Sequence, residues 1–149
     1  MMTTTGRNTT DTIDGFRGKY RFLSNFWMAP IIVGGRRWAS SEHCYQAAKS
    51  LRPVDWDLIS SRQTAGEAKR AGRHVLVRED WDTIKLEVME EIVREKFDQH
   101  VDLRNKLLST GSAKLIEQNT WGDTFWGMCG NTGHNHLGKI LMKIRGDYQ

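Results

Sequence analysis

SSEHCYQAAKSL, residues 40–51, is the stretch from which the fold is best predicted. Ser40 and Ser41 are natural N-caps, because a serine oxygen accepts a hydrogen bond from a free N–H of the first helical turn. Apolar residues then recur at i, i+3, i+4 and i+7, the stripe of an amphipathic helix: Cys44, Ala47, Ala48 and Leu51. We therefore expect a helix of about a dozen residues that ends near Leu51 and is stopped by Pro53.

A hairpin is predicted just before this helix. Pro30–Val33 and Arg36–Trp38 are separated by Gly34-Gly35. A glycine pair between two β-prone runs favours a tight turn, since glycine tolerates the positive φ that such turns require.

Helices are predicted for most of the chain that follows. A short helix is expected from about Asp55 to Ser60. Thr64 and Glu67 form a capping-box pattern that opens a helix ending around Gly72. The longest helix starts near Asp80, and its apolar side carries Trp81, Ile84, Val88, Ile92 and Phe97.

Two further helices are predicted towards the C-terminus. The first stops before Gly111 and is marked by Leu103, Leu107 and Leu108. Asn135 can cap the second, whose apolar positions are Leu137, Ile140, Leu141 and Ile144. Between them, Asn119 to His134 has almost no periodicity, which is typical of a long functional loop. The expected fold is α+β and mainly α, with a flexible arm over residues 1–14 and one compact domain over residues 15–149.

Composition limits the classes of protein that fit. A net charge of +4 favours anionic partners, and its even spread argues against a protein that coats DNA. Cys44 and Cys129 are too few for a disulfide scaffold, which favours a reducing, cytoplasmic location. No apolar run reaches the length of a membrane-spanning helix, so no membrane association is expected.

The helix predicted over residues 40–51 offers a first candidate site on its polar side. Glu42 and Lys49 are seven residues apart and return to nearly the same angle, with Gln46 between them. A solvated face explains them too, because Glu in a first turn and Lys in a last turn complement the helix dipole. In a cavity, the carboxylate could instead stabilise charge at a ribose C1′ or transfer protons, and the amine could form a Schiff base.

Other segments carry residues suited to a nucleotide. In Trp121–Gly127, two indoles flank Asp123, and aromatic faces can stack on a base, although Phe125 and Trp126 could equally fill the core. Ser24-Asn25-Phe26-Trp27 offers an amide for a ribose hydroxyl, or forms an ordinary turn. The group Lys69, Arg70 and Arg73 could hold a phosphate or be a solvated helix face.

Several well-known motifs are absent from the sequence. The five histidines show no metal spacing, and His134 and His136 have no cysteine or carboxylate partner at a known zinc spacing, so no metal and no cofactor are expected. The glycine patterns of dinucleotide-binding folds and P-loops, and the nucleophile elbow of α/β-hydrolases, do not occur.

Taken in order, the motifs resemble those of the YbiA/NADAR family from about Phe16 to Arg145. The matching pieces are Phe22–Phe26, Ser41–Lys49, Gly72-Arg73, Asp80-Trp81, Lys85, Met89, Lys96-Phe97, Leu107-Leu108, Gly122–Gly127 and Asn135–Lys139. The resemblance implies an N-glycosidase that acts on ribosylated early intermediates of riboflavin synthesis or removes ADP-ribose from guanine in nucleic acid. Its substrate partner would be a small nucleotide or an ADP-ribosylated nucleic acid.

The resemblance also implies residue roles. Glu42 would act as acid/base or charge stabiliser, Lys49 as Schiff-base nucleophile, and Asp123 would orient ribose or water while Trp126 walls the base or sugar. The implied substrate-binding residues are Ser24, Asn25, Phe26, His43, Tyr45, Arg70, Arg73, Gly127 and Asn135. Two alternatives remain: a module that binds NAD or ADP-ribose without turnover, and a basic protein that binds nucleic acid non-specifically.

Overall fold

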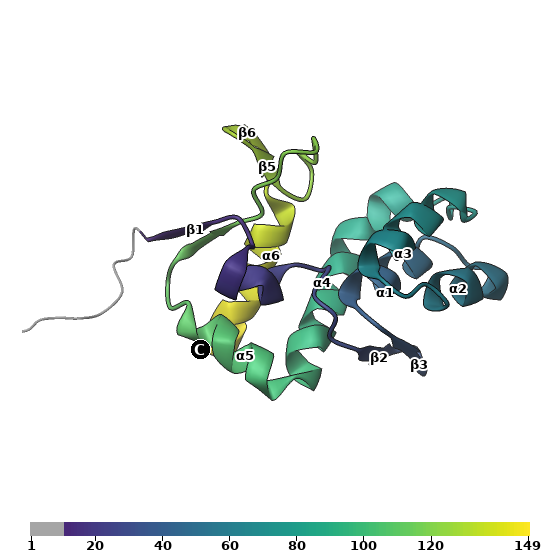
Figure 1. Cartoon of the computed structure of the whole chain (residues 1–149), viewed down its shortest axis with the longest axis horizontal. Coiled ribbons are helices and arrows are strands. Elements are labelled where there is room, and N and C mark those ends of the chain that lie inside the picture. The colour runs from purple at the N-terminus through teal and green to yellow at the C-terminus, as the bar shows by residue number, and fades with distance from the viewer. Residues whose placement is uncertain (1–10) are drawn as a thin grey trace, which may run out of the picture. The chain divides into compact units, whose positions relative to one another are not determined.

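Helices dominate the computed structural model, which describes residues 11–149 (Figure 1). The α+β, mainly α class is confirmed. The first ten residues of the expected N-terminal arm lie outside the described residues. Thr12–Asp14, at the end of that arm, form strand β1, so regular structure begins before residue 15.

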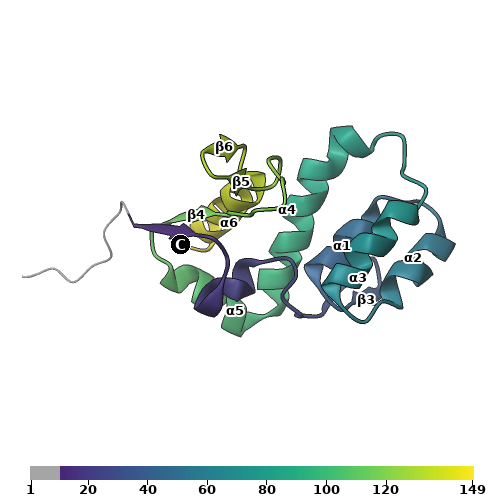
Figure 2. The same cartoon turned by 45° about the horizontal axis from the view of Figure 1, so that its top comes forward.

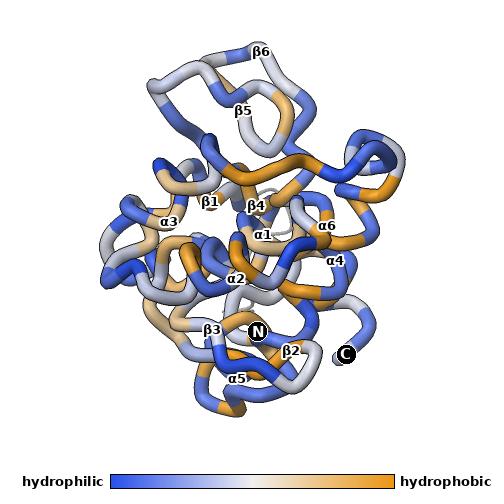
Figure 3. The backbone as a smooth tube through the Cα atoms, turned by 90° about the vertical axis from the view of Figure 1, so that its right-hand side faces the viewer, coloured by the Kyte–Doolittle hydropathy of each residue, from blue (hydrophilic) through white to orange (hydrophobic). Residues whose placement is uncertain are grey.

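The chain divides into two compact units. The central unit is Asn25–Val101, and the terminal unit combines the residues up to Ser24 with Asp102–Gln149. Figure 3 shows hydrophobic and hydrophilic positions alternating along the helices, as expected where one side of a helix is buried and the other is solvated.

The central unit begins with the predicted hairpin. Strands β2 (Ile31–Val33) and β3 (Arg36–Trp38) pair antiparallel, with Ile31 opposite Trp38. Gly34 and Gly35 have φ of 62° and 75°, the left-handed conformation that favours glycine in a two-residue turn. The predicted hairpin is therefore confirmed.

Four helices and a 3-10 turn follow: α1 (Ser41–Ala48), α2 (Pro53–Ser60), α3 (Ala65–Ala71), η2 (Gly72–His74) and α4 (Trp81–Gln99). Figures 1 and 2 show α1, α2 and α3 grouped together, and α1 also packs against α4. The Thr64–Glu67 capping box is confirmed, with both of its reciprocal hydrogen bonds present. Ser40 caps α1, since its Oγ accepts from the His43 N–H at 3.2 Å.

The predicted end of α1 was wrong. The helix ends at Ala48, and Leu51 lies beyond it with 63% of its surface exposed. Pro53 does not stop this helix but occupies the first turn of α2. A proline fits that place because the first helical N–H groups need no intrahelical partner and its fixed φ suits a helix.

Helix α4 buries a face that is rotated from the predicted one. Trp81, Ile92 and Phe97 are buried as expected, but Ile84 and Val88 are only partly buried. The fully packed positions also include Met89, Val93 and Lys96. On its partly exposed side, Glu90 and Arg94 form an i,i+4 ion pair at 3.2 Å.

Lys96 is an unusual member of this core, because it is only 1% exposed and burial lowers the pKa of its amine to about 7. An unfolded lysine has a pKa of about 10.4, so between these values the unfolded chain binds a proton that the folded chain has released. The wild-type free energy of unfolding should therefore rise with pH across this window.

We expect Lys96→Met to raise the free energy of unfolding at pH 7 by on the order of a few kcal/mol, since each pKa unit corresponds to about 1.4 kcal/mol. The free energy of unfolding of the variant should also lack the rise between pH 7 and pH 10 that is expected for the wild type. Urea unfolding at pH 7 and pH 10 measures both effects. Lys139→Met, at an exposed lysine, is the matched control, and equal behaviour of the two variants would contradict the prediction.

The terminal unit places a parallel strand pair beside its last helix. β1 pairs with β4 (Lys114–Ile116), so Ile13 lies opposite Leu115, and α6 (His136–Tyr148) packs against β4. The other elements are η1 (Gly18–Leu23), α5 (Val101–Ser109, whose first residue belongs to the central unit) and the hairpin of β5 (Met128–Cys129) and β6 (Thr132–Gly133). The stretch expected to be an irregular loop therefore contains a short hairpin.

Asn135 precedes α6 as predicted, but its side chain does not cap the helix. The residue has a φ of 51°. Its Nδ2 donates to the Leu115 carbonyl at 2.9 Å, and its Oδ1 accepts from the Glu117 N–H at 2.9 Å. The side chain therefore fixes the start of α6 to β4 instead of satisfying the helix itself.

Gly138 allows α6 to approach β4 this closely. A Cβ at Gly138 would overlap the carbonyl oxygen of Leu115 and the side chain of Asn135. We expect Gly138→Ala to lower the free energy of unfolding by about 3 kcal/mol, because the added methyl group meets backbone that cannot move aside. Gly146→Ala is the matched control in the same helix, since a Cβ there meets nothing within 4 Å. Thermal unfolding of both variants tests this, and equal melting temperatures would refute it.

Candidate active site

The polar face of α1 is buried, not solvated. Glu42 is only 8% exposed, Gln46 is 4% exposed and Lys49 is partly buried. The Gln46 Nε2 donates to Glu42 Oε2 at 2.6 Å, and the Glu42 N–H donates to the Asn25 carbonyl at 3.1 Å. The interpretation of Glu42 as part of a solvated face is therefore wrong, and its burial favours the interpretation as a site residue.

Lys49 follows α1 as its C-terminal cap and lies over the Tyr45 ring, with Nζ 5.7 Å from the ring centre. Burial lowers the pKa of the Lys49 amine. The charges of Lys69, Lys85 and Arg73 lower this pKa further, whereas the Glu42 carboxylate raises it. A lysine with a depressed pKa is neutral more often, and only the neutral amine is a nucleophile.

The cations around Lys49 come from three different elements. Lys69 lies on α3, Arg73 on η2 and Lys85 on α4. Lys85 contacts Asp82 at 3.3 Å, and the Lys69 Nζ lies 5.8 Å from the centre of the exposed Phe26 ring. A group of cations around one carboxylate raises the local positive potential, which suits an anionic ligand.

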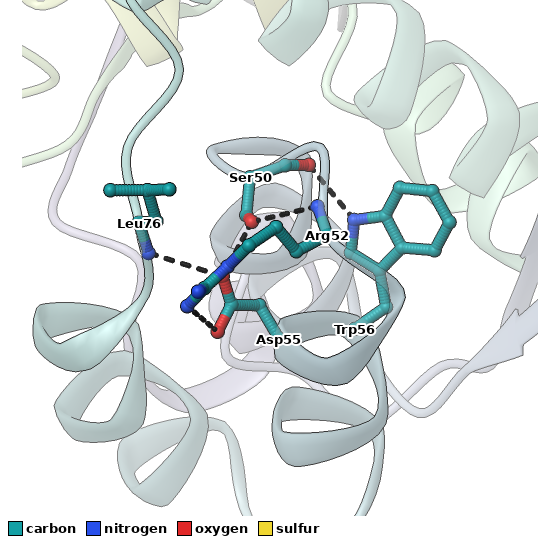
Figure 4. Close-up of polar contacts among 5 residues, drawn as sticks. All are labelled: Ser50, Arg52, Asp55, Trp56 and Leu76. Carbon is teal, nitrogen blue, oxygen red and sulfur yellow. Dashed lines mark hydrogen bonds and ion pairs between the residues drawn. The ribbon is translucent and has the colours of Figure 1, made fainter.

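The chain just after Lys49 is held by Asp55, as Figure 4 shows. The Asp55 carboxylate accepts from Ser50 Oγ at 2.6 Å, from Arg52 Nε at 3.0 Å and from the Leu76 N–H at 3.1 Å. The Arg52 hydrogen bond is the largest cause that lowers the pKa of Asp55 to about 2, followed by that of Ser50. Trp56 Nε1 also donates to the Ser50 carbonyl at 2.8 Å. This network fixes the end of the helix from which Lys49 extends.

Two residues of α1 with implied substrate contacts have other partners. His43 is completely buried, with its ring nitrogens 2.7 Å from Ser40 Oγ and 2.9 Å from the Arg62 carbonyl. Tyr45 is buried against Trp81, at 5.2 Å between ring centres. These contacts hold α1 in place, and we do not carry His43 or Tyr45 into the proposed site.

Of the other predicted binding residues, Asn25 is buried and donates from Nδ2 to the Met89 sulfur at 3.2 Å. Arg70 and Arg73 are exposed, and so is 42% of Phe26. Ser24 caps η1 and belongs to the terminal unit. Of these residues, two lie near α1 in the central unit. The Asn25 carbonyl accepts a hydrogen bond from the Glu42 N–H, and the charge of Arg73 lowers the pKa of Lys49.

Asp123 and Trp126 belong to the terminal unit, where Asp123 organises a turn. Its Oδ1 accepts from the N–H groups of Phe125 at 3.2 Å and Trp126 at 2.9 Å. Asn119 brackets the same residue, accepting from its N–H at 3.0 Å and donating to its carbonyl at 2.9 Å. One carboxylate oxygen thus fixes the conformation of the tryptophan turn.

Trp126 is part of a half-exposed aromatic group, not a buried core. Its ring meets Phe125 edge-on at 4.8 Å, and Phe125 also lies 4.6 Å from His136. His134 stacks on His136 at 5.3 Å. Within residues 11–149, no three His, Cys, Asp or Glu side chains are grouped so that they could hold a metal ion.

Gly127 and Asn135 have structural roles in this unit. A Cβ at Gly127 would overlap Glu117 and come within 2.7 Å of Asn119 Nδ2. Asn135 is buried and bonded to the backbone around β4. Their geometry explains these residue types without a substrate contact.

Sequence reasoning did not assign a role in the central site to two residues, Lys85 and Gly72. Lys85 is separated from α1 by more than thirty residues, so no local pattern links them. Gly72 was interpreted as a helix terminator, but its φ is −61°, and a Cβ there would overlap the Gln46 amide. Gln46 was placed on the correct face, and its i,i+4 spacing from Glu42 was the signal for their hydrogen bond.

A cavity of about 530 Å³ lies on the opposite side of α1, between it, β2 and α4. Cys44, Ala48 and Ile92 form part of its lining, and Glu95 is at its wall. Burial, with a smaller effect of the Glu95 charge, raises the pKa of the Cys44 thiol to about 12. This thiol is therefore protonated and unreactive at neutral pH.

Comparison with known proteins gives the family. The model of the NADAR domain matches residues 14–148. The N-glycosidase YbiA of Escherichia coli is 40% identical over 141 residues, which cover 91% of this chain and 88% of that protein. An N-glycosidase of Nostoc punctiforme is 42% identical over 132 residues, covering 85% and 84% of the two chains.

A solved structure and a longer relative agree with this result. The NMR structure of Escherichia coli YbiA superposes with a TM-score of 0.82 at 38% identity, covering 93% of this chain and 86% of that one. A riboflavin biosynthesis protein of Vibrio vulnificus is 42% identical over 131 residues, which are 86% of this chain and 35% of that protein. No helix within residues 11–149 has the length and apolarity to cross a bilayer. The protein is an enzyme that hydrolyses N-glycosyl bonds, and it belongs to the NADAR domain family.

Proposed function

We propose that the substrate is a phosphorylated ribosyl or ADP-ribosyl compound, and that Glu42 and Lys49 of α1 act at its C1′ carbon. The observation that carries this proposal is the electrostatic coupling of a buried carboxylate to a partly buried amine on the same helix face. Glu42 is 8% exposed, and its carboxylate is close enough to influence the pKa of Lys49. Buried groups with perturbed protonation are concentrated at catalytic sites.

The charge around α1 supports a phosphorylated substrate. The positive charges of Lys69, Arg73 and Lys85 all lower the pKa of the Lys49 amine, so the three side chains are grouped around it. Arginine and lysine are the usual partners of phosphate. The exposed Phe26 ring below Lys69 adds an aromatic surface on which a base can stack.

Two chemical routes use these residues. In the first, the glycosidic bond breaks through an oxocarbenium-like state that the Glu42 carboxylate stabilises, and water then adds to C1′. In the second, the neutral Lys49 amine attacks C1′ and the base leaves with a proton. The sugar ring then opens to a Schiff base, which water hydrolyses to free sugar and regenerated amine.

We consider two substrate classes, and the names of two relatives support the first of them. A relative from Vibrio vulnificus and one from Zea mays, 34% identical over 124 residues, are riboflavin biosynthesis proteins. Ribosylated aminopyrimidine intermediates of that pathway are therefore the first candidates. ADP-ribosylated guanine in nucleic acid is the second, because it presents the same N-glycosidic bond to ribose next to phosphates.

Two proposals concern the terminal unit. Asp123 orients a ribose hydroxyl or water, and Trp126 contacts the base or sugar. The fixed conformation of the turn supports both proposals, because the Trp126 N–H donates a hydrogen bond to Asp123 Oδ1. The Trp126 side chain is also only partly buried.

The test is to incubate the protein with an aminouracil ribotide and, separately, with DNA that carries ADP-ribosylated guanine. Chromatography and mass spectrometry should detect one of two outcomes. Cleavage of the ribotide gives a free base and ribose phosphate, whereas cleavage of the DNA substrate gives free ADP-ribose and leaves unmodified guanine in the DNA. If both substrates remain intact, the proposed substrate class is wrong. Tight binding of ADP-ribose by calorimetry without any product would then favour a non-catalytic binding module.

A further inference from the structure

Gln46 forms a short hydrogen bond to the carboxylate of Glu42. Its Nε2 donates to Glu42 Oε2 at 2.6 Å, across one turn of α1. Both side chains are more than nine-tenths buried. A hydrogen bond to a charged acceptor in such surroundings is stronger than one in water, so it restricts the position of the carboxylate.

The orientation of the Gln46 amide follows from this contact. If the amide were turned over, its oxygen would face the Glu42 carboxylate, and two acceptors would repel each other. In the observed orientation Gln46 Oε1 is buried and has no hydrogen-bond partner among the described residues. The amide therefore gives up one of its own hydrogen bonds and keeps the one to Glu42.

Gly72 supplies the space that this orientation requires. A Cβ at Gly72 would overlap Gln46 Oε1 and lie 2.7 Å from its Cδ. Gly72 is in an ordinary helical conformation, with φ of −61°, so its backbone does not need glycine. The close approach of the Gln46 amide is the reason for glycine at this position.

We propose that Gln46 is a positioning residue for Glu42. The absence of a side chain at Gly72 leaves the space in which the Gln46 amide can take the required conformation. The hydrogen bond fixes Oε2 of the carboxylate and stabilises its ionised form, so the group faces C1′ in one orientation. This inference rests on the proposed role of Glu42 in the reaction.

The first test replaces Gln46 with methionine, which has nearly the same volume but no N–H donor. We expect Gln46→Met to lower kcat by about 10-fold with little change in KM, because one fixed contact of a catalytic carboxylate is lost. The acid limb of the pH–rate profile should move to higher pH, since the carboxylate takes up a proton more readily. Gln63→Met, at an exposed glutamine, is the control and should change neither quantity.

The second test separates positioning from packing. Gly72→Ala should displace the Gln46 amide and reproduce the lower kcat and the shifted pH profile. In a Gln46→Ala background the same change should have no further effect, because there is no amide left to displace. Gly146→Ala controls for the substitution itself. Additive losses in the double variant would mean that Gly72 acts by packing alone.

The two proposals fail in distinguishable ways. If the wild type cleaves its substrate and Gln46→Met has the same kcat and pH profile, the positioning role is wrong and the proposed function stands. If the wild type cleaves neither substrate, the inference is still tested by carbon-13 NMR titration of the Glu42 carboxyl group. The carboxyl should titrate at higher pH in Gln46→Met than in the wild type, and identical titration would overturn the inference.

Discussion

Glu42→Gln should lower kcat by about 10³-fold or more, the range in which loss of a catalytic acid/base or charge-stabilising group falls. The variant should remain folded, because the new amide oxygen can still accept the hydrogen bond from Gln46 Nε2. What it loses is the negative charge that would stabilise an oxocarbenium-like transition state. Single-turnover assays measure the rate of bond cleavage, and circular dichroism measures whether the variant remains folded.

Glu87→Gln is the control for this change, since Glu87 is an exposed glutamate on α4. It should retain wild-type activity. A Glu42→Gln enzyme that turns over its substrate at the wild-type rate would remove Glu42 from the chemistry and leave its burial as a structural feature only.

Lys49→Ala should lower activity by about 10²-fold or more and abolish covalent trapping, because a missing nucleophile removes the Schiff-base route. Borohydride added during turnover should reduce an imine on the wild type and leave a sugar adduct on Lys49, which peptide mass spectrometry can locate. Trapping should increase with pH as the amine loses its proton. Since burial and neighbouring cations lower the pKa of Lys49, this increase should begin below the pH expected for an exposed lysine.

Lys49→Arg distinguishes charge from nucleophilicity. Arginine keeps a positive charge at this place but forms no imine. If Lys49→Arg is as inactive as Lys49→Ala, the amine acts by attack on C1′. Full activity of the arginine variant, or the absence of any adduct on the wild type, would support a direct hydrolytic route that depends on Glu42.

Local signals in the sequence predicted the local parts of the fold. The glycine pair at 34–35 defined the hairpin, and Ser40 and the Thr64–Glu67 box defined two helix starts, because each signal acts within four residues. The pairing of β1 with β4 was not predictable, since three-residue strands about a hundred residues apart leave no periodic trace. Pro53 was misread because proline is compatible both with the end of one helix and with the start of the next.

The candidate site was predictable to a similar extent. Glu42, Gln46 and Lys49 share a helix face, and helical spacing alone groups them. Their burial, and the approach of Lys85 and Gly72, depend on how α1 packs against α3 and α4. Spacing could therefore identify which residues face one direction, but not whether that direction was solvent or a site.

The pairing of β1 with β4 has a consequence for biosynthesis. Thr12–Asp14 cannot find their partner strand until Lys114–Ile116 have been synthesised, by which time all of Asn25–Val101 has left the peptidyl transferase centre. Every residue that we place around Glu42, from Asn25 to Lys85, therefore precedes β4 on the nascent chain. Domains tend to fold as units during translation, so the central unit can acquire its structure on the ribosome, while the terminal unit must wait for α6 to emerge.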